Sequence, residues 1–130
     1  MRTTRDFVRP GRSLAVGERG MAACSHPAAA LAAREILLEG GNAMDAALAA
    51  IAVHSVVDPH MTGIGGDCFV LYAPKGGLPL AYNGSGRAPA AATLDWYRER
   101  GIAAIPDETP HAVTVPGAID AWCRMAEDHG

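Results

Sequence analysis

The stretch Val57–Tyr72, which reads V-D-P-H-M-T-G-I-G-G-D-C-F-V-L-Y, constrains the fold of this chain more than any other. An apolar helix is expected to enter it and a hydrophobic strand to leave it, with glycine at positions 63, 65 and 66 between them. Three glycines in four positions indicate positive φ angles or a backbone that passes very close to another group. A phosphate-binding loop needs the opposite order, with the strand first and the helix last, and it needs G-K-[ST]. The order therefore favours a tight backbone crossing over a nucleotide cradle.

Two helices are predicted before the glycine turn. The first begins at Ser25 or His26, has a proline in its first turn and ends at a Gly-Gly pair. The second spans residues 42–56, and Asn42 and Asp45 are expected to form a capping box at its start. Its body is apolar on nearly all sides and rich in alanine, which predicts a buried helix with closely packed neighbours.

Strands and further helices are predicted on both sides of this pair. Thr93 is expected to cap a short helix over 94–100, and Pro116-Gly117 to open an amphipathic helix whose inner face holds Ala118, Ile119, Trp122, Met125 and Ala126. The β-rich runs predict a hairpin and two separate short strands. The class is therefore α+β, with a partly antiparallel sheet. The predicted strands are Gly20–Cys24, Cys68–Tyr72, Leu78–Tyr82 and His111–Val115.

Length and composition limit the classes of protein to be considered. The 130 residues are 49% hydrophobic and 19% charged, as expected for one globular domain preceded by an arginine-rich extended arm over residues 1–19. A net charge of −3 and 5% aromatic residues argue against a nucleic-acid partner. No apolar run reaches the length of a membrane span or a secretory signal. Three widely spaced cysteines are not a disulfide framework, so a cytoplasmic location is expected.

Two catalytic arrangements near the turn have weak support. A metal site would need closely spaced ligands such as H-x-x-x-H or C-x-x-C, and these are absent, so no metal is expected. A Cys68–His60 nucleophile pair is the other arrangement. Cys68 opens a strand that is expected to be buried, however, and no third orienting group is evident. The residues considered as metal ligands were His26, His54, Asp58, His60 and Asp67.

Arg87 is the strongest candidate for a binding group. It lies between a glycine turn and a proline, on a corner that is expected to be stiff and exposed. A guanidinium in that place can hold a carboxylate through two parallel hydrogen bonds. The alternative is an ordinary surface arginine, and the pattern alone does not separate the two.

Five segments in a fixed order resemble the N-terminal part of the gamma-glutamyltranspeptidase family, over about residues 9–130. The pair G-G-N-A-x-D-A-A and P-H-x-x-G-I-G-G is the specific part of this signal. The segments are G-M-A-A-C-S-H-P at 20–27, E-G-G-N-A-M-D-A-A-L-A-A at 39–50, V-D-P-H-M-T-G-I-G-G-D at 57–67, S-G-R-A-P at 85–89 and V-T-V-P-G-A at 113–118.

The resemblance implies an N-terminal portion, residues 20–130, of an Ntn-hydrolase domain with αββα layers. A proenzyme of this family cuts itself, and the threonine freed at the start of the small subunit attacks a γ-glutamyl amide without a cofactor. No threonine of this chain matches that nucleophile motif, so the catalytic residue is expected to lie outside it, on a small-subunit partner. The chain alone is then expected to be inactive. The threonines compared were Thr62, Thr93, Thr109 and Thr114.

One departure from the family pattern concerns the substrate. Many family members carry R-E-x-A-P where this chain carries S-G-R-A-P, so Ser85 occupies the position of the carboxylate-binding arginine and Gly86 that of the glutamate. Arg87 lies two places further on. It either reaches the same carboxylate by a different loop path or leaves it unbound. Substrates other than γ-glutamyl compounds, such as oxamate-type or acylase-type amides, therefore stay open. So does a non-catalytic small α/β binding module.

Overall fold

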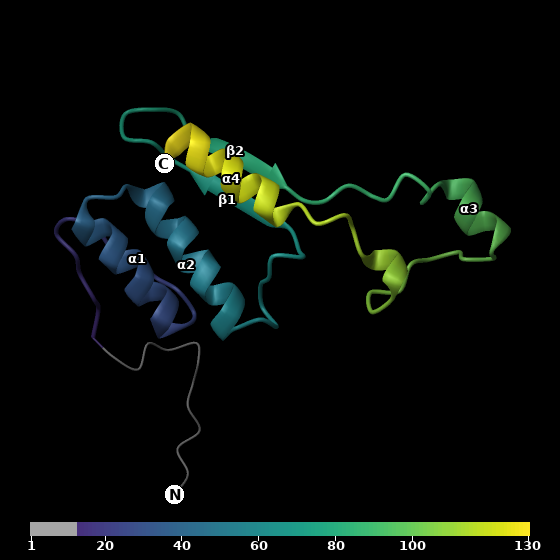
Figure 1. The fold of residues 1–130 in the computed structure, drawn as a ribbon, viewed down its shortest axis with the longest axis horizontal. Coiled ribbons are helices and arrows are strands. Elements are labelled where there is room, and N and C mark those ends of the chain that lie inside the picture. Colours follow the sequence, from purple (N-terminus) through teal and green to yellow (C-terminus); the bar gives the residue numbers. More distant parts are fainter. Residues whose placement is uncertain (1–12) are drawn as a thin grey trace, which may run out of the picture.

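The computed structural model describes residues 13–130, and the elements in order are two helices, a hairpin, a short helix, a 3-10 turn and a last helix (Figure 1). Helices α1 and α2 lie side by side, and α4 lies across the hairpin and also contacts α2. The segment with α3 extends away from this body. The bounds are α1 Pro27–Glu39, α2 Ala43–Val57, β1 Cys68–Tyr72, β2 Leu80–Gly84, α3 Leu94–Glu99, η1 Pro110–Ala112 and α4 Ala118–His129.

The predicted helix ends are confirmed by their caps. The His26 side chain accepts from the Ala28 N–H, and Gly40 closes α1 in the left-handed region at φ 98°. At α2, the Asn42 side chain accepts from the N–H groups of Met44 and Asp45, and the Asp45 carboxylate accepts from the Asn42 N–H. These are local hydrogen bonds that satisfy the unpaired N–H groups of a first turn.

The hairpin is confirmed, but its second strand begins two residues later than predicted. The strands pair antiparallel from Cys68 opposite Gly84 to Tyr72 opposite Leu80. Pro79 lies just before β2 rather than within it, because proline has no N–H to donate to the ladder. The inner face of β1 contributes Cys68, Val70 and Tyr72 to a cluster with α2 and α4, whereas Phe69 and Leu71 on the other face are exposed.

Two predicted strands, Gly20–Cys24 and His111–Val115, are wrong for the part of the chain that the structure describes. Residues 20–24 form no helix or strand, and η1 replaces the start of the second segment. A β-rich run becomes a strand only where another strand supplies its hydrogen bonds. Within residues 13–130 the sheet has two strands, and neither pairs with these segments. The arm prediction falls mostly on residues 1–12, which lie outside the described residues.

The predicted backbone crossing at the glycine turn is also wrong within the described chain. None of Gly63, Gly65 and Gly66 has positive φ, and a Cβ added at Gly63 or Gly65 would meet no atom within 4 Å. The close approach lies further along the chain. A Cβ at Gly86 would overlap the carbonyl oxygen of Val115, and one at Gly117 would overlap that of Gly84.

The core is made mostly of alanine. Of the eight buried hydrophobic side chains among the described residues, six are alanine and two are methionine. On α4 the buried face differs from the prediction, because Ala121 is buried while Ile119 and Ala126 are exposed. No helix of residues 13–130 has the length and apolar character of a membrane span.

Replacing Asn42 should loosen the start of α2. Its amide also donates to the His129 carbonyl at 2.7 Å, so it joins α2 to the end of α4. Loss of such a cap costs about 1 kcal/mol. In the full-length protein, Asn42→Ala should therefore speed amide exchange in the first turn of α2 by about fivefold, measured by hydrogen-exchange mass spectrometry. Glu39→Ala, at the exposed end of α1, is the control; equal exchange in the two variants would contradict the cap.

Replacing Gly86 should strain the contact between residues 84–88 and 113–117. Because a methyl group there would overlap the Val115 carbonyl, Gly86→Ala should lower the free energy of unfolding by about 1 to 3 kcal/mol. Ser85→Ala places the same side chain one residue earlier, at an exposed position, and should leave the melting temperature unchanged. Equal melting temperatures for both variants of the full-length protein would refute the steric requirement.

Candidate functional site

Three of the motif segments meet at one place, beside the first turn of α4. The carbonyl oxygen of Gly66 accepts from the N–H groups of Gly117 and Ala118, at 3.2 and 3.0 Å. Gly117, the N-terminal cap residue of α4, has no side chain to satisfy these donors. The end of the glycine turn therefore caps this helix, and α4 is held against the start of β1.

Asp67 joins the other two segments. Its Oδ1 accepts from the Gly86 N–H at 3.1 Å and from the Thr114 hydroxyl at 3.3 Å. The three residues come from the segments 57–67, 85–89 and 113–118, respectively. The sequence indicates Asp67 only as a possible metal ligand and does not predict this contact. Its signal in the sequence is weak, because nothing in the spacing brings residues 67, 86 and 114 together.

Arg87 and Ser85 lie on either side of Gly86, and both are exposed. The Val115 N–H donates to the Arg87 carbonyl at 2.9 Å, and the Ser85 N–H donates to Asn83 Oδ1 at 3.0 Å. Their backbones are thus fixed. Within residues 13–130 the Arg87 guanidinium forms no ion pair or hydrogen bond. A guanidinium can pair with the two oxygens of a carboxylate.

A second polar cluster joins the N-terminus of α1 to the C-terminus of α2. His54 Nε2 lies 2.8 Å from the Ser25 hydroxyl and 3.0 Å from Asp58 Oδ2, while His60 Nδ1 lies 2.9 Å from Asp58 Oδ1. In a catalytic triad, serine and aspartate contact different ring nitrogens of the histidine. Here both contact the same nitrogen. His54 is thus a hydrogen-bonded histidine at the end of α2, and the cluster does not have the geometry of a catalytic triad.

The structure does not bring Cys68 and His60 together as a nucleophile pair. Cys68 is half-buried in the cluster between β1, α2 and α4, and the His60 imidazole contacts Asp58. Within residues 13–130 no group of three histidine, cysteine, aspartate or glutamate side chains could hold a metal ion. Tyr82 donates to Asp128 Oδ2 at 2.8 Å. That hydrogen bond raises the pKa of Tyr82 above its ordinary value, so the phenol stays a protonated link between β2 and α4.

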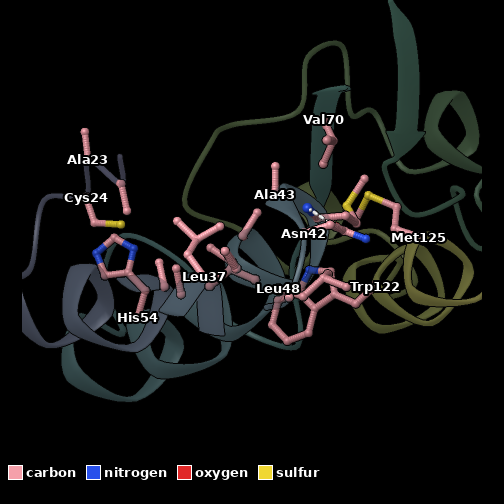
Figure 2. A pocket seen from close by; sticks show the side chains of 18 of the residues that line it. Ala23, Cys24, Leu37, Asn42, Ala43, Leu48, His54, Val70, Trp122 and Met125 are labelled. Atoms are coloured by element: carbon pink, nitrogen blue, oxygen red, sulfur yellow. Dashed lines mark hydrogen bonds between the residues drawn. The ribbon is translucent and has the colours of Figure 1, made fainter. Parts of the chain in front are cut away.

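A large hollow of about 960 Å³ lies between α1, α2 and β1 (Figure 2). Its lining is mostly apolar and comes from all of these elements and α4, as Leu37, Leu48, Val70 and Met125 show. Trp122 also lines it, and its buried indole N–H has no hydrogen-bond partner among the described residues. Neither Arg87 nor Ser85 contributes to the lining. Asp67, which accepts from the N–H of Gly86 between them, does line the hollow.

Known proteins resemble this chain in both sequence and structure. The glutathione hydrolase-like YwrD proenzyme of Bacillus subtilis (strain 168) is 42% identical over 117 residues, which cover 88% of this chain and 22% of that protein. The oxamate amidohydrolase proenzyme of Klebsiella pneumoniae is 44% identical over 108 residues, covering 82% of this chain and 20% of that protein. The crystal structure of Helicobacter pylori gamma-glutamyltranspeptidase matches with a TM-score of 0.80 at 30% identity, over 91% of this chain and 35% of that chain.

These matches show which family the chain belongs to and how much of each relative it covers. The chain spans about a fifth of the length of the two relatives named above. Its mixed α and β fold corresponds to part of a solved gamma-glutamyltranspeptidase. The family model described as gamma-glutamyltranspeptidase covers residues 29–130, which include four of the five motifs completely. By sequence and by fold, this chain belongs to the gamma-glutamyltranspeptidase family.

Proposed function

We propose that this chain is the N-terminal part of a self-cleaving amidohydrolase or acyltransferase whose nucleophilic threonine lies outside these 130 residues. The observation that carries the proposal is the family match over residues 29–130. Two further facts support it. Relatives named as proenzymes align with this chain over a fifth of their length, and the cluster of Ser25, His54 and Asp58 among residues 13–130 does not have the geometry of a catalytic triad.

The chemistry follows from a threonine at a new N-terminus. Its hydroxyl attacks the amide carbonyl carbon while the free α-amine takes the hydroxyl proton. The C–N bond then breaks, and the departing nitrogen receives that proton and leaves as an amine. Water or a second amine attacks the acyl-enzyme ester, which releases the acid or a new amide and restores the threonine hydroxyl. Each step needs only a nucleophile and a proton carrier, so no cofactor is required.

In this proposal the chain supplies the scaffold and one binding group. The Arg87 guanidinium, exposed and unpaired among the described residues, would hold a carboxylate of the amide substrate, and the Ser85 hydroxyl two residues earlier would add a neutral donor. A guanidinium is suited to this role because its donors match the two oxygens of a carboxylate. The reacting carbonyl would lie beyond this chain, beside the threonine of the small subunit.

The loop geometry favours an amide other than a γ-glutamyl compound as the second candidate substrate. A Cβ at Gly86 would overlap the Val115 carbonyl, so this backbone cannot carry the glutamate found there in R-E-x-A-P loops. A loop with a different path presents its arginine from a different place. A compact carboxylate-bearing amide, as the name of the oxamate amidohydrolase relative suggests, would suit such a change.

A complete binding module is disfavoured by the exposed apolar surface. Phe69 and Leu71 on the outer face of β1 are 67% and 85% exposed, and six of the eight buried hydrophobic side chains are alanine. Burying one large apolar side chain contributes about 1.5 to 3 kcal/mol, and this chain buries few. In αββα layers, the outer face of the hairpin and the hollow between α2 and β1 would be covered by the remainder of the full-length protein.

The substrate class can be tested with the full-length protein that carries this segment. After self-cleavage is verified by gel electrophoresis, the protein is incubated with γ-glutamyl-p-nitroanilide and, separately, with oxamate. Release of nitroaniline supports γ-glutamyl transfer, whereas release of ammonia from oxamate alone supports the second candidate. Normal self-cleavage without release of nitroaniline would rule out a γ-glutamyl substrate. Hydrolysis of another amide would then remain as the proposed activity.

The role of Arg87 can be tested by its removal. Arg87→Ala in the full-length enzyme should cost about 2 to 3 kcal/mol of substrate binding, which is roughly a 30- to 150-fold rise in KM. Arg98→Ala is the control, because Arg98 is also an exposed arginine. It lies on α3 and forms a long ion pair with Asp95, at 3.8 Å. An unchanged KM in Arg87→Ala would make Arg87 an ordinary surface residue.

A further inference from the structure

Asp67 contacts the loop that carries Arg87 through a backbone N–H. Its carboxylate oxygen accepts from the Gly86 N–H at 3.1 Å, and Gly86 directly precedes Arg87. This hydrogen bond fixes the peptide plane between Ser85 and Gly86, which is one residue before the peptide that joins Gly86 to Arg87. The hydrogen bond from Val115 to the Arg87 carbonyl, at 2.9 Å, fixes the peptide plane on the C-terminal side of Arg87.

The carboxylate is itself held in place. Thr114 donates its hydroxyl to the same oxygen at 3.3 Å, and Thr114 directly precedes Val115. Asp67 also follows Gly66, whose carbonyl caps α4. Asp67, Thr114 and the backbone segment that contains Arg87 are thus connected by hydrogen bonds. A rigid set of this kind reduces the conformational freedom that a binding side chain loses when its ligand arrives.

We propose that Asp67 is a positioning residue: through the Gly86 N–H, it fixes the backbone from which Arg87 presents its guanidinium to a substrate carboxylate. The inference rests on the proposed function, because it requires that Arg87 binds the substrate. In this role Asp67 needs no contact with the substrate or the reacting atoms. Its effect passes only through the loop that carries Arg87.

The test is a double-mutant cycle in the full-length enzyme, using a carboxylate-bearing amide and its carboxamide analogue as substrates. Asp67→Ala should raise KM for the carboxylate substrate about tenfold, while kcat and the KM of the carboxamide analogue change less than twofold. Because the effect passes through Arg87, the variant that combines Asp67→Ala with Arg87→Ala should have the KM of Arg87→Ala alone. Additive effects of the two substitutions would overturn the proposal.

Conservative variants separate positioning from folding. Asp67→Asn keeps an acceptor oxygen and should restore KM to within threefold of the natural protein. Thr114→Val removes one donor and keeps the shape, so it should raise KM about threefold. Asp107→Ala removes an exposed loop carboxylate and serves as the control. If Asp67→Ala does not fold, an unchanged KM in Thr114→Val overturns the proposal.

Two patterns distinguish failure of this inference from failure of the proposed function. If Arg87→Ala raises KM and Asp67→Ala does not, Arg87 binds substrate without help from Asp67, and only this inference fails. If Arg87→Ala leaves KM unchanged, the proposed binding group fails, and the positioning role fails with it.

Hydrogen exchange supplies a readout independent of activity. Asp67→Ala should speed exchange of the Gly86 amide, whereas the Asp107→Ala control should not. Unchanged exchange at Gly86 in Asp67→Ala would also overturn the inference.

Discussion

The acceptors at Gly66 and Asp67 join the parts of this structure that are far apart in sequence. One backbone carbonyl and one carboxylate oxygen receive four donors, from Gly86, Thr114, Gly117 and Ala118. These contacts bring the end of the glycine turn, the S-G-R-A-P loop and the start of α4 to one place. Without them, the ends of the long segment between β2 and α4 would be held together only by backbone contacts. Bringing the ends of a segment together has an entropic cost that grows with its length.

The alanine-rich packing explains both the compact helix pair and the incomplete surface. Alanine on the facing sides of α1 and α2 lets the two backbones approach closely, and Ala29, Ala33, Ala46 and Ala50 form one buried cluster there. The same small side chains bury little apolar area, so each contributes less to stability than a leucine would. The larger apolar residues are instead on the outer face of the hairpin and on the exposed sides of the helices. This distribution fits a segment that packs against the remainder of a longer protein.

Features that depend on residues close together in the sequence were predicted correctly. Features that depend on contacts between distant segments were not. The caps at His26, Asn42 and Thr93 were predictable because each involves residues two or three positions apart. The strands at 20–24 and 111–115 were not, because a strand needs a partner and residues 13–130 supply none for them. The family was predictable from the order of its motifs. The contact of Asp67 with residues 86 and 114 was not, because it spans 19 and 47 positions.

Glycine placement links this packing to the chemistry of the loop. The glycines of the turn at 63 and 65 face open space, whereas those at 84, 86 and 117 lie against backbone atoms. Close contact at Gly86 has two consequences for a binding loop. It leaves position 86 without a side chain, so Arg87 is the charged group that the loop presents to solvent. It also lets the Gly86 N–H approach Asp67, so the residue before Arg87 is held by hydrogen bonding rather than by side-chain packing. The change from R-E-x-A-P to S-G-R-A-P therefore alters the support of the arginine together with its position.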